Sequence, residues 1–518
     1  MHLNFDNRFT RALPQDPNPA NERRQVLGAL WSAVEPTPVA APRLIAASAD
    51  MLRALGLSEA DAQSSTFAQV FAGNALLPGM QPYAGNYGGH QFGQWAGQLG
   101  DGRAITLGEA LGADGQRWAL QLKGAGATPY SRHADGRAVL RSSIREFLCS
   151  EAMHHLGIPT TRALSLVATG EAVVRDMFYD GHPKPEPGAV VCRAASSFLR
   201  FGHFELPASR DDVGLLRQLA DFCIAQDFPH LVTHDKAYTY AAWFAEVAER
   251  TARLIAEWMR VGFVHGVMNT DNLSIIGLTI DYGPYGWLDD YNPRFTPNTS
   301  DPRGRYCFAN QPGVALWNLQ RLAVALSPLF EDSALLEAGL ERYVHTYTQA
   351  EQDNACRKLG FSAGHPQAQT LMSRVQEWMQ QAEVDMTLFW RTLSEHPADR
   401  LTPATFAQSF YREDKRAAHE STLALWLADW RAALAENGQS EEARQRLCLQ
   451  ANPRFILRNW LVQQAIEQAE QGDEGAIHRL LALLRNSYET QPGDTAYVVR
   501  RPEEARFQPG CSMLSCSS

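Results

Sequence analysis

Four parts of the sequence carry residue types that together can handle phosphate groups. Glycines allow backbone N–H groups to approach phosphate oxygens closely, because no Cβ stands in the way. A lysine supplies a mobile positive charge for the same oxygens, and a nearby carboxylate can hold that lysine in place. Asn and Asp side chains offer the hard oxygen ligands that Mg²⁺ prefers. The four parts are a glycine-rich stretch over residues 83–103, Lys123, Glu146, and a loop over residues 265–283 that contains Asn272 and Asp281.

The order of these parts matches that of protein kinases: strand lysine, helix glutamate, loop asparagine, then Asp-x-Gly. Each part alone also has a purely structural explanation. Lys123 fits a solvated lysine at a strand edge, and His265 fits a buried core histidine. Glu146 fits a capping box with Ser143 at the start of a helix. The interpretation of the four parts as a kinase-like phosphate site therefore rests on three features together: their order, their spacing and the helix, strand or loop expected for each.

One position departs from the kinase pattern. In kinases the residue that accepts the proton of the attacked hydroxyl lies two positions after the histidine of this loop. Here that position is Val267, whose side chain cannot accept a proton. A carboxylate occurs instead at Asp271, next to the expected metal ligand Asn272, where it fits a proton acceptor, an outer metal ligand or a loop cap. A simple kinase mechanism thus fails at the residue that should activate the hydroxyl.

The spacing of apolar residues predicts the elements that position these groups. Trp118, Leu120 and Leu122 alternate with other residues, which predicts a half-buried strand ending at Lys123. An amphipathic helix is expected from about 143 to 156, and Gly157 is expected to end it. Further expected elements are a hairpin over 163–175, a strand over 189–193, a long helix over 237–261, a hairpin over 273–280, and helices over most of the chain from 314 to 486.

This layout, with a sheet-rich first third and a helical remainder, predicts an α+β fold. Taken with the kinase order of parts, it indicates a protein-kinase-like two-lobed fold. Residues 1–205 are expected to form the N-terminal lobe with its glycine-rich nucleotide loop, the first 80 residues being an irregular wrap. Residues 206–330 would form the C-terminal lobe with the catalytic and metal-binding loops, 331–490 a helical extension, and 491–518 a tail with Cys511 and Cys516, whose last residues, 510–518, are Ser-rich and expected to be mobile.

Composition narrows the class of protein. The chain has 518 residues, with 47 Lys and Arg against 57 Asp and Glu, and no basic run, which disfavours nucleic acid as a partner. No apolar stretch approaches the length that spans a membrane, and no secretory signal is evident at the start. We therefore expect no membrane partner and a cytoplasmic location, with the first six cysteines as free thiols.

The sequence also resembles a known family, the selenoprotein O family of kinase-fold protein adenylyltransferases. The resemblance covers most of the chain and rests on long, mutually distant motifs: Leu3-Asn-Phe-Asp-Asn-Arg-Phe9, Gly88-Gly-His-Gln-Phe-Gly93, Leu99-Gly-Asp-Gly-Arg103, His265-Gly-Val-Met-Asn-Thr-Asp-Asn272, Asp281-Tyr-Gly-Pro284, Asn452-Pro-Arg-Phe455 and the Cys-Ser-Ser end. It implies that ATP binds reversed in a kinase cleft, with its γ-phosphate inward and its α-phosphate facing the acceptor. AMP would then pass to Ser, Thr or Tyr hydroxyls of proteins, including the chain itself, and pyrophosphate would leave.

Carried over to this sequence, the resemblance also implies residue roles. Asp271 would accept the proton, while Asn272 and Asp281 would bind Mg²⁺, with Mn²⁺ as an alternative. The residues expected to contact the nucleotide or hold its phosphates are Gly100, Gly102, Arg103, Lys123 with its ion-pair partner Glu146, Asp135, Gly136, Arg193 and Arg200. Several cations around one triphosphate would stabilise pyrophosphate as the leaving group.

Three alternatives stay open from the sequence. They are a conventional phosphotransferase, transfer of UMP from UTP, and an inactive nucleotide-binding pseudokinase scaffold. Val267 argues against the first, and the presence of Lys123, Asn272 and Asp281 argues against the last. A redox role is a further hypothesis for Cys516, which lies third from the end near Cys511, with an incidental thiol as the alternative.

Overall fold

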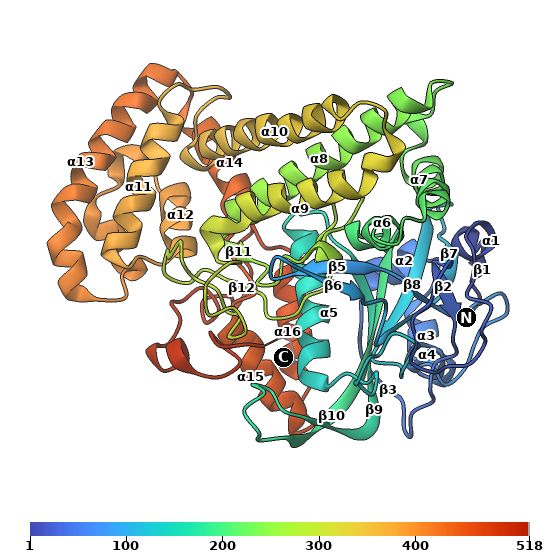
Figure 1. Cartoon of the computed structure of the whole chain (residues 1–518). Coiled ribbons are helices and arrows are strands. Elements are labelled where there is room, and N and C mark those ends of the chain that lie inside the picture. The colour runs from blue at the N-terminus through green and yellow to red at the C-terminus, as the bar shows by residue number, and fades with distance from the viewer. Residues whose placement is uncertain (516–518) are drawn as a thin grey trace.

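An antiparallel sheet of eight strands is the scaffold of the first 200 residues (Figure 1). The computed structural model describes residues 1–515. The strands are β1 (Asn4–Phe5), β2 (Trp31–Ala33), β3 (Arg43–Ala47), β4 (Tyr83–Gly85), β5 (Gly88–Gln91), β6 (Gln94–Gln98), β7 (Ala104–Leu111), β8 (Arg117–Lys123), β9 (Arg162–Arg175), β10 (Lys184–Ala195), β11 (Phe263–Val264) and β12 (Gly286–Trp287). The sheet has the order β2-β4-β7-β8-β10-β9-β3, with β1 paired to β7, whereas β5–β6 and β11–β12 form separate two-stranded pairs.

Helices cover both faces of this sheet and make up most of the chain after residue 200 (Figure 1). They are α1 (Arg8–Ala12), α2 (Ala49–Ala54), α3 (Glu59–Ala62), α4 (Ser65–Ala72), α5 (Leu140–His155), α6 (Phe201–Ala208), α7 (Val213–Asp227), α8 (Lys236–Val261), α9 (Gln311–Leu326), α10 (Ala334–Leu359), α11 (Ala368–Ala382), α12 (Met386–Glu395), α13 (Glu413–Asn437), α14 (Glu441–Ala451), α15 (Asn459–Glu470) and α16 (Gly475–Leu484). The expected long helix at 237–261 and the helices between 314 and 486 are confirmed.

Three hydrophobic clusters fill the spaces between these layers. One lies between the sheet and the N-terminal helices, and contains Phe67, Phe71 and Leu120. The largest contains α5, α8 and the C-terminal helices α15 and α16. The third holds the helical extension around α11, α12 and α13, so the Trp and Leu residues there are core.

Strand β8 has the predicted alternation but is buried on both faces. Leu120 and Leu122 pack into the cluster below the N-terminal helices, while Gln121 and Lys123, which lie on the opposite face, are also buried. The prediction of a half-buried strand is therefore wrong, because an alternating pattern does not reveal that the polar face is covered by the rest of the fold. Burial of Gln121 and Lys123 requires partners for both.

Helix α5 begins at Leu140, three residues before its predicted start, with Val139 as the N-cap. Glu146 therefore lies inside the helix and cannot cap it with Ser143, so the capping-box explanation is wrong. The helix is also more buried than an amphipathic pattern indicates. It packs against β9 and β10 on one side and against α15 and α16 on the other.

Both predicted hairpins differ from the structure. Residues 163–175 do not turn back but form the single long strand β9, which pairs with β10. Gly170, near the middle of the expected hairpin, has φ of +73° within β9, close to a register shift between Pro187 and Ala189 in β10. Within residues 273–280 a single bridge joins Leu273 to Thr279, while Ser274 and Thr279 also form bridges with Arg200 and Thr160.

The two ends of the described chain are more regular than the sequence indicates. The first 80 residues supply β1, β2 and β3 to the sheet, and β3 pairs with β9. At the other end, Leu514 is fully buried and forms a bridge with Asn298, so the expected mobility is wrong for the tail up to residue 515. Cys511 is buried, which raises the pKa of its thiol to about 11, and Cys516 lies outside the described residues.

A buried ion network ties the helical extension to the segment after β12. Arg458, just before α15, donates to both oxygens of Asp385, at 2.9 and 3.0 Å, and pairs with Asp289 as well. Asp385 in turn caps α12 by accepting from the backbone N–H of Leu388.

Within residues 1–515, none of the helices combines the length and apolar character needed to cross a membrane.

Replacing Arg458 by Met should lower the free energy of unfolding by about 3 kcal/mol or more, because the buried Asp385 loses its guanidinium partner and Asp289 keeps only Arg501. Burial already raises the pKa of Asp289, and Arg458 opposes this rise. Without Arg458 the folded-state pKa rises further, so the deficit should be largest at alkaline pH and shrink as the pH falls through that pKa. Urea unfolding of the variant and of the wild type at pH 5 and pH 8 measures this.

The matched control is Arg357→Met, which removes a half-exposed arginine paired with Glu257. It should cost no more than about 1 kcal/mol. An Arg458→Met deficit that is equal at both pH values would contradict the assignment to buried carboxylates.

Candidate active site

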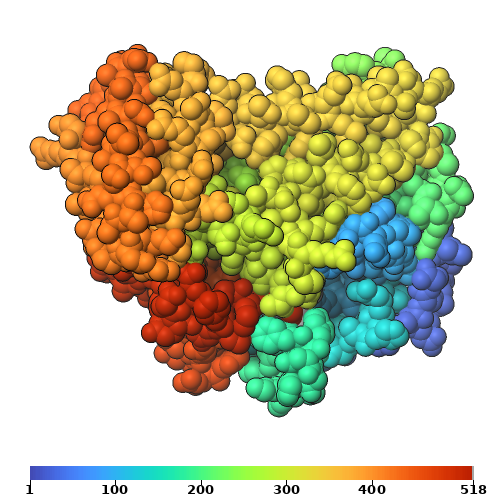
Figure 2. Space-filling view, turned by 60° about the vertical axis from the view of Figure 1, so that its left-hand side comes forward, coloured from blue at the N-terminus to red at the C-terminus, as the bar shows by residue number. Residues whose placement is uncertain are grey.

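A cavity of about 380 Å³ lies between the sheet and the loop that contains Asp271. Its walls come from residues 87–104 and 123–134, from Arg193 and Arg200, and from residues 267–281. Figure 2 shows the corresponding blue-to-cyan and yellow-green segments meeting on one face of the molecule, with the teal segment near residue 180 beside them. The parts that the sequence analysis singled out are thus brought together around one space.

Lys123 lies in a buried ion cluster beside this cavity. Its Nζ is 2.6 Å from Oε2 of Glu146 and 3.4 Å from Oδ1 of Asp281. Arg193 contacts the same two carboxylates, at 3.0 Å and 3.5 Å. Burial lowers the pKa of Lys123, whereas Glu146 and Asp281 act in the opposite direction. Two buried cations therefore share two carboxylates, of which Glu146 is buried and Asp281 is partly exposed to the cavity.

Sheet register sets the position of this cluster. Arg193 in β10 lies directly opposite Gln121 in β8, and its guanidinium donates to the Gln121 side chain. Lys123 is the last residue of β8, two positions further along the same face. Glu146 reaches both cations from α5, which crosses this end of the sheet.

Arg200 adds a third buried cation. It is the N-cap of α6, and its Nη1 donates to the backbone oxygen of Asp271 at 3.0 Å. Its guanidinium also lies over the ring of Tyr87, 4.9 Å from the centroid. Arg103 lies just before β7 and lines the same cavity. All four arginines and lysines that the sequence analysis named therefore surround one space.

Asp281 has a strained backbone and an ionised side chain. Its φ is +60°, a left-handed conformation that is uncommon for a residue with a Cβ. Burial alone would raise the pKa of Asp281, but Lys123, Arg200 and Arg193 outweigh it and hold the pKa well below its usual range. A carboxylate kept charged at a strained position is typical of a functional site.

Asn272 and Asp281 fit a divalent cation. The Nδ2 of Asn272 donates to the backbone oxygen of Val267 at 3.0 Å, which fixes the amide. Its Oδ1 is buried and accepts no hydrogen bond from any residue between 1 and 515. Such an acceptor is costly unless a ligand completes it. An amide oxygen and a carboxylate on one cavity are the hard ligands that Mg²⁺ or Mn²⁺ takes.

Asp271 has one carboxylate oxygen held and one free. Oδ2 accepts from Nε2 of Gln91 at 3.2 Å, while Oδ1 has no hydrogen-bond partner in the described part of the chain. Burial raises the pKa of Asp271 to about 7, with Gln91 and Arg200 opposing the rise. His265, by contrast, contacts the Ile280 carbonyl oxygen through Nε2 at 2.9 Å and is a satisfied core residue.

The two loop glycines at 100 and 102 are required by packing. A Cβ at Gly100 would lie 2.4 Å from the ring of Tyr130, and one at Gly102 would lie 2.9 Å from the Tyr130 carbonyl oxygen. Asp101 between them is buried and accepts from the backbone N–H of Gly85 at 2.9 Å. The loop is therefore fixed against the 128–131 segment, and both glycines line the cavity.

Comparison with known proteins agrees with this geometry. A family model described as "Protein adenylyltransferase SelO" matches residues 20–485. A protein of Xanthomonas axonopodis pv. citri (strain 306) named "Protein nucleotidyltransferase YdiU" is 60% identical over 518 residues, which are 100% of both chains. A protein of Xanthomonas oryzae pv. oryzae (strain MAFF 311018) with the same name is 59% identical over 517 residues, covering 100% of this chain and 99% of the relative.

The chain belongs to the SelO family. The resemblance stated from the sequence is confirmed, and the protein is an enzyme, a protein nucleotidyltransferase. Its substrates are therefore a nucleotide and a protein.

Two of the predicted residues lie apart from the ion cluster of this SelO-family enzyme. The carboxylate of Asp135 pairs with Arg175 at 2.6 Å and is half exposed. Gly136 lies where two chain segments cross, and a Cβ there would be 2.1 Å from the carbonyl group of Gly126. Neither residue lines the cavity as it stands, although the neighbouring Ala134 does.

Sequence reasoning missed several residues of the SelO-family cavity. Gln91 and Phe92 were quoted within the Gly-Gly-His-Gln-Phe-Gly motif without a role, and Arg132 and Tyr179 were not named at all. The available signal was the motif itself, because three glycines around a polar residue indicate a backbone that approaches something closely. Nothing local marks Arg132 or Tyr179.

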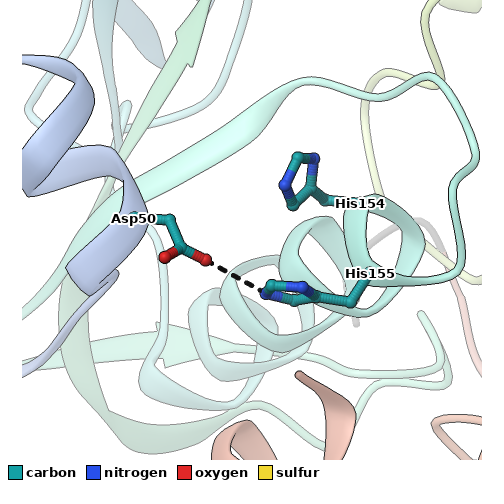
Figure 3. A group of neighbouring side chains, drawn as sticks. All are labelled: Asp50, His154 and His155. Atoms are coloured by element: carbon teal, nitrogen blue, oxygen red, sulfur yellow. Dashed lines mark ion pairs between the residues drawn. The ribbon is translucent and has the colours of Figure 1, made fainter. Parts of the chain in front are cut away.

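A second group of possible metal ligands in this SelO-family chain lies on other elements. Asp50 of α2 and the adjacent His154 and His155 of α5 place one ligand atom each within 4.8 Å of one another (Figure 3). None of the three lines the cavity described above. Asp50 is already paired with Arg53 and with His155, so its carboxylate has protein partners. We assign no role to this group.

Replacing Glu146 by Gln should destabilise the enzyme strongly, because Lys123 and Arg193 would then share Asp281 alone. We expect a loss of about 3 kcal/mol in the free energy of unfolding. Urea denaturation followed by tryptophan fluorescence measures it.

Glu249→Gln is the control, since Glu249 pairs with Arg253 and Arg342 on the surface. That variant should lose less than about 1 kcal/mol. Equal losses in the two variants would show that the Glu146 cluster does not hold the fold.

Proposed function

We propose that this enzyme transfers AMP from ATP to Ser, Thr or Tyr hydroxyls of proteins and releases pyrophosphate. The observation that carries this proposal is the set of buried cations beside the cavity, Lys123, Arg193 and Arg200. Three cations held together match the several negative charges of a triphosphate tail, and beside the β- and γ-phosphates they would neutralise the charge that develops on pyrophosphate. Arg103 adds a fourth positive charge at the same cavity.

The proposal includes the orientation of the nucleotide. If the β- and γ-phosphates take the places beside Lys123 and Arg193, the α-phosphate is left toward Asp271 and the acceptor. The acceptor oxygen then forms a bond to the α-phosphorus, and the bond from that phosphorus to pyrophosphate breaks. Charge that develops on pyrophosphate is already neutralised by the buried cations, so pyrophosphate becomes the better leaving group.

Asp271 is the proposed proton acceptor in this step. Its Oδ1 has no partner within the described residues, and it lines the cavity beside the proposed metal ligands. The proton of the acceptor hydroxyl would move to the Asp271 carboxylate as the new bond forms. Val267, at the position where a kinase carries its base, has no group that could do the same.

Asn272 and Asp281 would hold a divalent cation, for which we propose Mg²⁺ with Mn²⁺ as an alternative. Bound there, the cation would supply positive charge to the phosphate oxygens. The chain's own contribution is the fixed amide of Asn272, locked by Val267, and the ionised carboxylate of Asp281, held by Lys123 and Arg193.

We also propose a kinase-like arrangement of the chain. Residues 1–205 would be the N-terminal lobe, 206–330 the C-terminal lobe, 331–490 a helical extension and 491–518 a tail. The cavity between the sheet and the loop at 267–281 supports this division. So does the separate hydrophobic cluster of the extension.

ATP labelled at the α-phosphate tests the reaction. The label should appear on denatured casein, used as a generic acceptor, and on the enzyme itself, whereas ATP labelled at the γ-phosphate should leave no label. Transfer of the γ-label would favour the conventional phosphotransferase. The relatives' name, nucleotidyltransferase, leaves the nucleotide open, so α-labelled UTP belongs in the same experiment; faster transfer from UTP would replace AMP by UMP.

Replacing Asp281 by Asn should reduce transfer of the α-label by at least about 100-fold, because a cation ligand and the partner of two buried cations are lost together. Asp221→Asn, which changes a surface carboxylate paired with Lys236, should leave transfer unchanged. If the Asp281→Asn enzyme transfers the label as fast as the wild type, the assignment of Asp281 as a metal ligand is wrong. If the wild type transfers no label from any nucleotide, the scaffold alternative is favoured.

A further inference from the structure

The hairpin β5–β6 lies over the loop that carries Asp271 and contacts it at three successive positions. The backbone N–H of His90 donates to Oγ1 of Thr270 at 2.7 Å. The side chain of Gln91 donates to Oδ2 of Asp271 at 3.2 Å. The backbone N–H of Phe92 donates to Oδ1 of Asn269 at 3.1 Å. Because β5–β6 is not part of the large sheet, its contacts with the rest of the fold must come from such interactions.

Glycines allow this hairpin to approach the carboxylate directly. A Cβ at Gly89 would lie 2.7 Å from Oδ1 of Asp271, closer than real Cβ contacts allow. On the other side, a Cβ at Gly202 of α6 would lie 2.0 Å from the carbonyl oxygen of Gly88. The hairpin is therefore packed tightly between α6 and the Asp271 loop.

The turn of the hairpin has a strained conformation. Phe92 has φ of +51° and is followed by Gly93 at +86°. A left-handed conformation is unfavourable for a residue with a Cβ, so the surrounding contacts must compensate for it. Here the Phe92 N–H also donates to the Tyr306 hydroxyl at 2.9 Å, and that hydroxyl donates to Asn269 at 2.6 Å. The strained turn thus directs a backbone donor at the same loop.

The outer side of the hairpin is fixed as well. Nδ1 of His90 is 2.6 Å from Oε1 of the buried Glu205. The His90 ring also contacts the rings of Trp95 and Trp317, with centroids 5.1 and 5.6 Å away. A side chain carried by a strand that is held on both sides has little freedom to move.

We propose that Gln91 is a positioning residue for nucleotidyl transfer: its amide holds Oδ2 of Asp271 and so fixes the rotation of the carboxylate that accepts the hydroxyl proton. This inference rests on the proposed function, in which Asp271 accepts the hydroxyl proton as the oxygen bonds to the α-phosphorus and pyrophosphate leaves. Gln91 takes no part in bond making. Without its N–H donor the carboxylate can rotate, and fewer encounters place a carboxylate oxygen within reach of the proton.

The test compares Gln91→Met with Gln94→Met, both made in the full chain. Methionine has nearly the shape of glutamine but has no N–H donor. Gln94 lies opposite Gln91 in the hairpin and is exposed, so it serves as the matched control. Transfer from α-labelled ATP to denatured casein is measured at varied ATP concentration, together with the thermal midpoint of each protein.

Gln91→Met should lower kcat by about 10- to 100-fold while the KM for ATP stays within about twofold, because the nucleotide contacts are untouched. Gln94→Met should match the wild type. Gln91→Glu, which keeps the shape of the side chain and places a second acceptor against Asp271, should be at least as slow as the methionine variant. If Gln91→Met fails to fold, the kcat of Gln91→Glu tests the positioning role in its place.

Equal kcat values in the Gln91 and Gln94 variants would overturn the inference, as would a rise in KM for ATP with kcat unchanged. Asp271→Ala, measured alongside, separates this failure from that of the proposed function. If Asp271→Ala loses transfer and the Gln91 variants do not, only the positioning role is wrong. If Asp271→Ala keeps full transfer, the proposed base is wrong and the positioning role is overturned with it.

Discussion

The structure depends on the burial of Lys123 and Arg193 against Glu146 and Asp281. Cations are taken out of water only where carboxylates compensate for the lost hydration, so each of the four groups constrains the other three. Glu146 is nearly inaccessible to solvent, and only a helix that crosses the sheet at this level can place it there. Asp281 completes the cluster from the opposite wall of the cavity and accepts a left-handed backbone to do so. The position of α5 and the path of the chain at Asp281 therefore follow from one electrostatic requirement.

The same cluster explains why the region around it contains so much glycine. Charged side chains fill the cavity wall, and the backbone segments that complete the wall must pack closely against their neighbours. The absence of a Cβ at Gly100 and Gly102 leaves room for Tyr130, and its absence at Gly89 leaves room for the carboxylate of Asp271. In this part of the chain glycine thus marks close contact between protein segments as much as contact with a substrate. The flexibility that glycine has in an open loop is lost here, because the space beside each Cα is occupied.

The sequence was a good guide wherever periodicity was long or chemistry came in a fixed order. The 26-residue helix α8 and the pairing of Lys123 with Glu146 are both predicted from the sequence and found in the structure. Local signals were misleading where tertiary contacts decide. Ser143 and Glu146 have capping-box spacing, yet the helix starts at Leu140, and Arg141 in its first turn pairs with Glu186 of β10. Gly170 signalled a turn, but pairing along β10 keeps β9 extended.

In the candidate site, too, some residues could be predicted from the sequence and others could not. Residue type and order were enough to find the groups that carry charge, because buried charge and metal ligation allow few residue types. They were not enough for Gln91, Arg132 or Tyr179, whose places depend on how distant segments fold over the cavity. Gln91 is the clearest case, since a glutamine in a glycine-rich motif has no chemistry of its own until the structure places its amide against Asp271.

The late bridge between Leu514 and Asn298 has a consequence for how the molecule is made. Asn298 donates through Nδ2 to the carbonyl oxygen of Gly266, at the start of the loop that leads to Asp271, and the backbone N–H of Thr299 donates to the carbonyl oxygen of Leu514. During synthesis this contact forms only after Leu514 has been added, 215 residues after Thr299, whereas β3 waits only for β9. The sheet can thus assemble early, but the loop of the second half gains this support only much later in synthesis.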